Sequence, residues 1–301
     1  MKRLLLHVGY PKSASTSLQN GLFLQLHNEK VINFLGRAFE SGFYGTKQSK
    51  AAYKDWFDHV VDNGAAGGVA IGDLSGSMPN VLSEGLFMMN ERRSESIVGP
   101  QLLHKYFSPM ADRLDVLIVI RRQSDLIPSY YTQNYRKLDE KLFADYLAHN
   151  LKQNWNGEAK IFNFRDVARA YTAVFGKEHV HVVLFEDFVR NRERFGAQVA
   201  RALAVEPAVI ARHFGDEHLN QTRKEAGVLV IRKLAKKSMR HRLIRALEAV
   251  GLKAADSLRV KIPAVTDEEK KTIFDSFKTS NLQLAEEFSL DKPAMREYGY
   301  F

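Results

Sequence analysis

The side chains best suited to chemistry lie near the amino terminus, where one lysine is followed by a run of hydroxyl residues. The lysine is Lys12, and the hydroxyl residues are Ser13, Ser15, Thr16 and Ser17. An apolar run at residues 4–8 has the length of a buried strand, and leucines recur at helical spacing over residues 15–27. A turn between a strand and a helix aims backbone N–H groups and the positive end of the helix dipole at one point. The sequence therefore predicts a site that binds phosphate or a similar anion.

The spacing in this stretch differs from that of an ordinary nucleotide P-loop, which has Gly directly before Lys and four residues between its glycines. Here Pro11 precedes Lys12, and only two residues separate that lysine from Gly9. The run Gly-Tyr-Pro-Lys-Ser-x-x-Thr instead resembles the 5′-phosphosulfate loop of the sulfotransferases that use 3′-phosphoadenosine 5′-phosphosulfate (PAPS). Ala14 stands where that family has Gly, and Ser15 stands where it has Thr.

A second candidate anion site follows the most apolar strand predicted in the chain, residues 116–120. Arg121 leaves the carboxyl end of that strand, on the side where α/β sheets bind ligands. Ser129 lies in the first turn of a helix predicted to begin near Asp125, and a guanidinium with a hydroxyl there can bind an anion through charge-assisted hydrogen bonds. The pattern Arg-x-x-x-Asp-x-x-x-Ser-x-Tyr, which ends at Tyr131, resembles the 3′-phosphate motif of the same sulfotransferases.

In this second motif, Arg122-Gln123 replaces the Asn-Pro that is common in the family. A third and weaker match is Arg223-Lys224, which resembles the late basic loop that closes over the 3′-phosphate. The resemblance implies PAPS as the donor, adenosine 3′,5′-bisphosphate (PAP) as the product, and no requirement for a metal. The donor-binding residues that it implies are Pro11, Lys12, Ser13, Ala14, Ser15, Thr16, Ser17, Arg121, Ser129, Arg223 and Lys224.

The resemblance also assigns catalysis to Lys12, which would stabilise negative charge on the leaving 5′-phosphate, and to Ser129, which would fix the register of the donor. The acceptor needs a general base within hydrogen-bond reach. Asp73 is our first choice, because it ends a predicted buried strand, residues 69–73, beside a serine-rich loop. The alternatives are Glu84 and His104.

Strands that alternate with helices predict an α/β fold with a mostly parallel sheet, and the resemblance implies a P-loop-like sheet flanked by helices on both faces. We interpret His7, inside the first strand, as a packed core residue. We expect one domain over residues 1–301, with a basic helical part from about residue 221. The predicted strands are residues 4–8, 31–36, 69–73, 116–120 and 180–184. The predicted helices are residues 15–27, 49–61, 141–151, 165–175, 191–203, 225–250 and 267–288, with a further helix from about residue 125.

The composition is that of an ordinary globular protein, with 45% apolar and 26% charged residues in a chain of 301. The chain contains no cysteine, which excludes disulfides, thiolate zinc sites, iron–sulfur clusters and a cysteine nucleophile. The first apolar run ends too early for a signal peptide, and no stretch approaches the ~20 apolar residues that cross a bilayer. We expect a cytoplasmic protein, with attachment at the inner membrane surface as a variant of that expectation.

Basic residues are concentrated in one segment. Residues 221–261 contain twelve Lys or Arg and three Asp or Glu, so this segment alone matches the net charge of +9 of the whole chain. The predicted helix over residues 225–250 either has a merely solvated basic face or attracts an acidic glycan or an anionic membrane surface. No nucleic-acid motif and no interleaved aromatic residues accompany the charge, which argues against nucleic acid as a partner.

Three functions account for these features to different degrees. A PAPS-dependent sulfotransferase that acts on a hydroxyl or amine of a carbohydrate or glycolipid uses both anion motifs. A P-loop kinase that uses ATP and magnesium would explain the apolar strand ending at Asp73, but it requires Gly before Lys12 and has no use for a 3′-phosphate site at Arg121. A basic protein that binds polyanions or membranes without catalysis is favoured only by Ala14.

Overall fold

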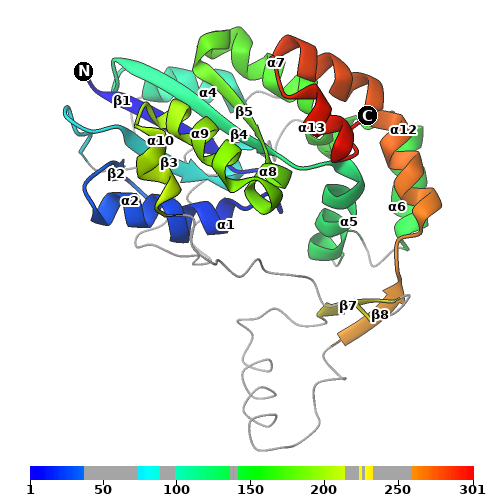
Figure 1. Ribbon diagram of the computed structural model, residues 1–301. Helices are drawn as coiled ribbons and strands as arrows, with labels where there is room; N and C mark the ends of the chain where they lie inside the picture. Colours follow the sequence, from blue (N-terminus) through cyan, green and yellow to red (C-terminus); the bar gives the residue numbers. More distant parts are fainter. Residues whose placement is uncertain are drawn as a thin grey trace, which may run out of the picture.

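Five strands form the centre of the structure, which is a computed structural model (Figure 1). The structure describes residues 1–36, 73–88, 99–135, 138, 142–213, 224–225, 228–232 and 259–301. The five strands are β1 (Arg3–Val8), β2 (Asn33–Phe34), β3 (Asn80–Glu84), β4 (Arg113–Ile120) and β5 (Val180–Leu184). Their order is β2-β3-β1-β4-β5, and every neighbouring pair runs parallel. The predicted parallel sheet is confirmed.

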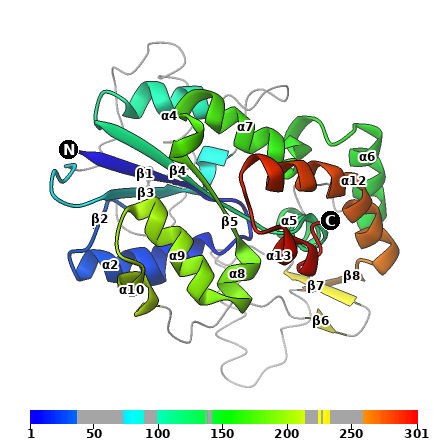
Figure 2. The same ribbon diagram turned by 45° about the horizontal axis from the view of Figure 1, so that its top comes forward.

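Helices cover both faces of this sheet (Figure 2). Those with their bounds are α1 (Ser15–Ser17), α2 (Leu24–Asn28), α4 (Gly99–Phe107), α5 (Gln123–Asn134), α6 (Phe143–Lys152), α7 (Phe164–Phe175), α8 (Phe185–Arg190), α9 (Arg192–Leu203), α10 (Pro207–Ala211), α12 (Asp267–Glu287) and α13 (Lys292–Glu297). A π-helical segment, η1 (Leu18–Phe23), joins α1 to α2. Short 3-10 segments lie at Gly85–Met88, Gly157–Phe162 and Lys177–His179.

Each face of the sheet contributes to its own hydrophobic core. Leu4 and Leu6 of β1 pack into the core shared with α4, α7 and α12. Leu5, which points the other way, packs into the core shared with α2, α9 and α10. Strands that are buried on both faces are continuous apolar runs, as β4 is from Leu114 to Ile120. Burial on both faces explains why the central strands could be recognised in the sequence as continuous apolar runs.

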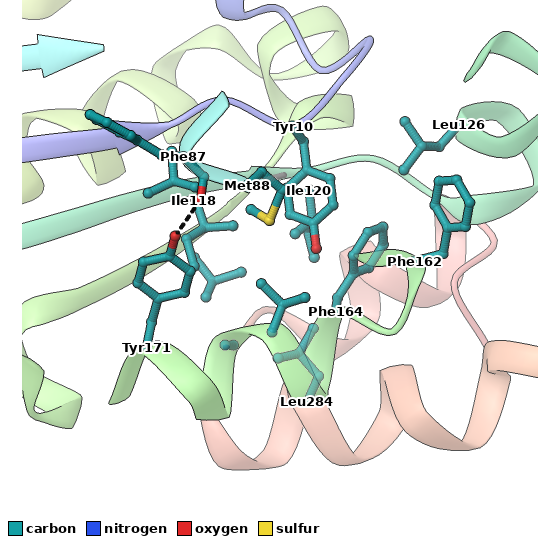
Figure 3. Close-up of a cluster of buried hydrophobic side chains, with 14 of the residues drawn as sticks. Tyr10, Phe87, Met88, Ile118, Ile120, Leu126, Phe162, Phe164, Tyr171 and Leu284 are labelled. Carbon is teal, nitrogen blue, oxygen red and sulfur yellow. Dashed lines mark hydrogen bonds between the residues drawn. The ribbon is translucent and has the colours of Figure 1, made fainter. Parts of the chain in front are cut away.

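Aromatic residues in the first of these cores hold the start of the loop that follows β1 (Figure 3). Tyr10 is buried, and its hydroxyl donates a hydrogen bond of 2.6 Å to the carbonyl oxygen of Ile161. Its ring meets that of Phe164 edge to face, with 5.2 Å between the centroids. Tyr171 in turn donates to the carbonyl oxygen of Phe87 at 3.2 Å. The loop around Lys12 therefore starts from a rigid point.

A second, antiparallel sheet corrects the predicted helix over residues 225–250. Its strands are β6 (Lys224–Glu225), β7 (Val228–Arg232) and β8 (Arg259–Pro263), in that order. The run Val228-Leu229-Val230-Ile231 is mostly β-branched, which favours an extended chain over a helix. Residues 233–250 lie outside the described residues, so the basic helix is untested there, and the single domain also stays a prediction.

Most of the other elements lie where the sequence placed them, with small shifts at their ends. This holds for β1, β4 and β5 and for α6, α7, α9 and α12. Helix α4 and strand β3 were not predicted, and β3 begins at Asn80, where the expected serine-rich loop ends. The predicted helix at residues 49–61 and the strand at residues 69–72 lie outside the described residues. None of the helices that the structure describes combines the length and apolar character needed to cross a bilayer.

Candidate functional site

The loop between β1 and α1 has an unusual backbone. Lys12 and Ala14 both adopt left-handed conformations, with φ of 63° and 59°, and Ser13 lies between them. Alternation of this kind turns successive backbone N–H groups toward one concave side, which is the geometry of an anion-binding nest. A left-handed residue other than glycine costs about 1–2 kcal/mol. The strained backbone therefore coincides with the residues where the sequence predicted an anion site.

Gly9 is required by close packing at the start of this loop. A Cβ at this position would lie 2.8 Å from Ser15 Oγ and 3.2 Å from the Cα of Gly85. The N–H of Gly9 donates to the carbonyl oxygen of Glu84 at 3.3 Å, which keeps the loop beside the end of β3. The strand ends of β1 and β3 and the start of α1 thus meet at one point.

The loop residues differ in exposure in a way that suits an anion. Lys12 and Thr16 are exposed, whereas Pro11, Ser15 and Ser17 are half-buried. Ser13 is fully buried, and its Oγ has no hydrogen-bond partner among the described residues. A buried hydroxyl in this position is costly unless a ligand bonds to it. The donor set of the loop therefore fits a phosphate-like group.

Arg121 joins the second motif to the first. Its Nη1 donates a hydrogen bond of 3.1 Å to the carbonyl oxygen of Lys12, across the ends of β4 and β1. Its guanidinium lies over the ring of Phe185, 4.9 Å from the centroid. Its Nε is buried and has no hydrogen-bond partner within the described part of the chain. The structure thus brings together two candidate anion-binding groups that are far apart in the sequence.

Helix α5 begins earlier than expected. It starts at Gln123, and Arg122 is its N-cap residue, whereas the sequence predicted a start near Asp125. Asp125 lies in the first turn, where its carboxylate accepts a hydrogen bond of 2.7 Å from Nε of Arg122. Ser129 is half-buried and lies in the second turn of this helix, not in the first turn as the sequence predicted, because the helix begins earlier. Its helix starts at the strand end that carries Arg121, as predicted.

The structure places Asp73 away from the Lys12 loop. Asp73 is exposed, and its carbonyl oxygen accepts a hydrogen bond of 2.9 Å from Asn33 Nδ2. Asn33 pairs with Asn80, the first residue of β3. Asn80 in turn pairs with Leu4, near the amino end of β1, whereas Lys12 follows the carboxyl end of that strand. Asp73 therefore lies at the opposite end of the parallel strands from Lys12.

Glu84 lies where Asp73 was expected. It is the last residue of β3, it pairs with Val8 of β1, and its side chain is fully buried. His104, the other alternative, packs its ring edge to face on Phe175, with centroids 5.3 Å apart. Phe175 ends α7 just before the amino end of β5, away from the loop. Of the three candidates for the general base, Glu84 is therefore the one that lies beside the Lys12 loop.

A buried polar cluster that the sequence did not reveal lies on the other side of β3. His7 Nδ1 is 2.7 Å from Ser83 Oγ, and Nε2 of Gln19 donates to the same Oγ at 2.8 Å. His7 is fully buried, as interpreted, and burial lowers its pKa from 6.5 to about 4. Gln19 belongs to the π-helical segment η1, and such segments are frequent at functional sites. This cluster joins β1, β3 and the helix that follows the loop.

The third sequence motif is not placed by the structure. Arg223 lies outside the described residues, and for Lys224 only the backbone, at the start of β6, is described. Within the described ranges, no group of three or more His, Asp or Glu side chains could hold a metal ion.

The structure thus combines a parallel α/β sheet with two candidate anion-binding motifs, which follow the carboxyl ends of the adjacent strands β1 and β4. The sulfotransferase domain family matches residues 2–226 of the chain. The chain therefore belongs to this family and is a sulfotransferase enzyme, as its motifs indicated.

Two solved structures are similar along nearly the whole chain. A sulfotransferase from Alicyclobacillus acidocaldarius is 16% identical, with a TM-score of 0.52, and the match covers 97% of this chain and 98% of the other. The mouse sulfotransferase SULT7A1, crystallised with PAP, is 12% identical with a TM-score of 0.47, over 98% and 88% of the two chains. At these identities the first match shows a common fold. Among curated protein sequences, none matches this chain.

Proposed function

We propose that this sulfotransferase takes its sulfuryl group from PAPS and transfers it to a hydroxyl or amine of a carbohydrate or glycolipid. The observation that carries the choice of donor is the hydrogen bond of 3.1 Å from Arg121 to the Lys12 carbonyl. It places a guanidinium next to the loop that suits a 5′-phosphosulfate, and PAPS has a second anionic group, the 3′-phosphate, for that guanidinium. ATP has no 3′-phosphate.

Within this proposal, the Lys12 loop holds the 5′-phosphosulfate, and Arg121 and Ser129 hold the 3′-phosphate. PAPS supplies an activated sulfuryl group whose departure leaves negative charge on the bridging phosphate oxygen. The Lys12 ammonium and the loop N–H groups stabilise that charge more in the transition state than in the ground state. The buried Ser13 hydroxyl gains a hydrogen-bond partner there, and fixing both phosphates sets the register of the donor.

Glu84 takes the place of Asp73 as the general base that removes the proton of the acceptor. The assay is release of PAP from PAPS in the presence of a panel of monosaccharides and glycolipids. Glu84→Gln is expected to lower turnover about 10²- to 10⁴-fold, the usual range for a lost general base. Asp73→Asn, a matched neutralisation at the opposite sheet edge, is expected to keep near-full turnover. The reverse pattern would restore Asp73 and remove Glu84.

The rival reading as a kinase is tested by binding rather than by turnover. Calorimetric titration with PAP and with magnesium-ATP compares the two nucleotides directly. We expect the protein to prefer PAP, whereas preference for magnesium-ATP would overturn the choice of donor. Binding of neither would favour the polyanion-binding alternative.

The proposals for the acceptor and for the cellular location rest on the sequence alone. The basic segment at residues 221–261 would attract an acidic glycan or the headgroups of an anionic membrane, in a cytoplasmic protein. Under this proposal the KM for an anionic acceptor rises with salt concentration, while the KM for a neutral acceptor does not. Activity that is indifferent to salt and to anionic lipid would remove this part of the proposal.

A further inference from the structure

The carboxyl-terminal residues of the chain pack beside the strand end that carries Arg121 (Figure 2). Tyr300 is buried, and its hydroxyl donates a hydrogen bond of 2.7 Å to Glu186 Oε2. The same hydroxyl lies 3.3 Å from the carbonyl oxygen of Ile120, the last residue of β4. The end of the chain therefore contacts the backbone immediately before Arg121.

Glu186 extends this contact to the backbone on the other side of Arg121. Its Oε1 accepts a hydrogen bond of 3.1 Å from the N–H of Arg122, while Oε2 accepts from Tyr300. Burial raises the pKa of Glu186, and these two hydrogen bonds oppose that rise because they favour the ionised form. One tyrosine and one carboxylate thus hold both peptide units that flank Arg121.

The two residues that depart from the family's common Asn-Pro are connected to the same segment, Arg122 directly and Gln123 through Asn281. Nη1 of Arg122 donates to the carbonyl oxygen of Tyr298 at 2.9 Å. Gln123 and Asn281 bond to each other through both amides, at 2.9 and 3.0 Å, and Asn281 Nδ2 also donates to the carbonyl oxygen of Tyr300 at 3.0 Å. Gln123 and Asn281 are both buried. Arg122 therefore contacts the carboxyl-terminal segment directly, and Gln123 is connected to it through Asn281.

The segment is itself anchored independently of the Arg121 loop. Arg194 of α9 bonds to Asp291, the N-cap residue of α13, at 2.5 Å, and also to Asp187. Tyr298 donates from its hydroxyl to Asp187 Oδ1 at 2.9 Å. Because these contacts fix α13 on α8 and α9, the end of the chain can act as a rigid support.

We propose that the carboxyl-terminal segment, residues 298–301, positions Arg121 for a 3′-phosphate, with Tyr300 and Glu186 as the positioning residues. A guanidinium forms short bonds to a phosphate only when its backbone is held to within a fraction of an ångström. Loosening the flanking peptide units therefore weakens binding of the 3′-phosphate more than it weakens binding at the 5′ site. The inference rests on the proposed function, since it takes the 3′-phosphate of PAPS as the ligand of Arg121.

The test compares two nucleotides that differ only in the 3′-phosphate, PAP and adenosine 5′-monophosphate (AMP), by calorimetry. Tyr300→Phe is expected to weaken PAP binding about fivefold to tenfold, which lies within the range of indirect couplings, and to change AMP binding less than about twofold. Glu186→Ala is expected to act in the same way, and Glu186→Gln, which keeps an oxygen acceptor, to restore part of the preference. Tyr171→Phe is the matched control, because it removes a buried hydroxyl bonded to a carbonyl elsewhere in the core.

An unchanged ratio of PAP to AMP affinity in both Tyr300→Phe and Glu186→Ala would overturn the inference, even if both variants melt at lower temperatures. If Tyr300→Phe does not fold, the ratio in Glu186→Gln and Glu186→Ala decides. Equal affinity of the unmodified protein for PAP and AMP is a separate outcome, because it contradicts the proposed function itself and the inference with it.

Discussion

His7 provides a quantitative test of how the strand beneath the Lys12 loop is packed. The imidazole is fully buried, Nδ1 is 2.7 Å from Ser83 Oγ, and the ring meets Phe23 edge to face at 5.6 Å. Burial lowers the pKa of His7 from 6.5 to about 4. The folded protein therefore holds this histidine neutral at a pH where the unfolded chain would already protonate it.

The sign and size of the effect follow from linkage between proton binding and folding. Between pH 6.5 and about 4 the unfolded chain binds the proton more readily than the folded protein, so stability falls as the pH is lowered through this window. Each pKa unit corresponds to about 1.4 kcal/mol, so the pKa difference of His7 corresponds to about 3 kcal/mol lost by pH 4. Above pH 6.5 the contribution is fully retained.

The assay is urea unfolding, followed by tryptophan fluorescence, at intervals from pH 7.5 to pH 4.5. His7→Asn removes the titrating group and keeps a side chain that can bond to Ser83. The difference in unfolding free energy between the original protein and this variant is expected to move by 2–3 kcal/mol across the range, in favour of the variant at low pH (about 1.4 kcal/mol per pKa unit). His149→Asn, on the exposed face of α6, is the control, expected to change stability by less than about 0.5 kcal/mol. A pH-independent difference for His7→Asn would refute the reasoning.

Three further substitutions test the loop and the opposite edge of the sheet. Gly9→Ala forces contacts of 2.8 and 3.2 Å, so unfolding free energy should fall by about 1–3 kcal/mol and PAP binding should weaken in calorimetry. Ala14→Gly removes the left-handed penalty and should raise stability in urea by up to about 1 kcal/mol, whereas a loss would contradict the φ of 59°. Asp115 is fully buried and forms ion pairs with Arg3 at 2.6 Å and Arg113 at 2.9 Å. Asp115→Asn should therefore lower the free energy of unfolding by about 3 kcal/mol without changing PAP affinity. Altered PAP affinity would contradict a purely structural role for Asp115.

The central strands could be predicted, and the two candidate motifs recognised, because both are local features of the sequence. A continuous apolar run such as Val116–Ile120 can be satisfied only by burial on both faces. The capping of α12 is equally local, since Thr266 and Glu269 bond to each other's backbone N–H groups. These features need no information about distant residues.

The position of Glu84 beside the Lys12 loop and the second sheet could not be predicted in the same way. Strand β3 contains Asn80, Ser83 and Glu84, and these polar residues are buried only because neighbouring strands and Gln19 contact them. The more apolar run at residues 69–73 was therefore preferred, and Asp73 with it. The start of the basic segment was assigned to a helix because apolar positions recur among its basic residues, although the β-branched residues of β7 favour a strand. The left-handed backbone at Lys12 has no signature in residue type, because glycine usually marks such positions.

The central claim is that two loops bind the two phosphates of one nucleotide. Its most direct test is calorimetric titration of Lys12→Ala and Arg121→Ala with PAP and AMP. The account predicts that Lys12→Ala weakens both ligands. Arg121→Ala is expected to weaken PAP by about tenfold to a hundredfold, since a hydrogen bond to a charged group is worth about 1.5–3 kcal/mol, and to weaken AMP much less. Equal losses for PAP and AMP in Arg121→Ala, or no loss for either ligand in Lys12→Ala, would contradict it.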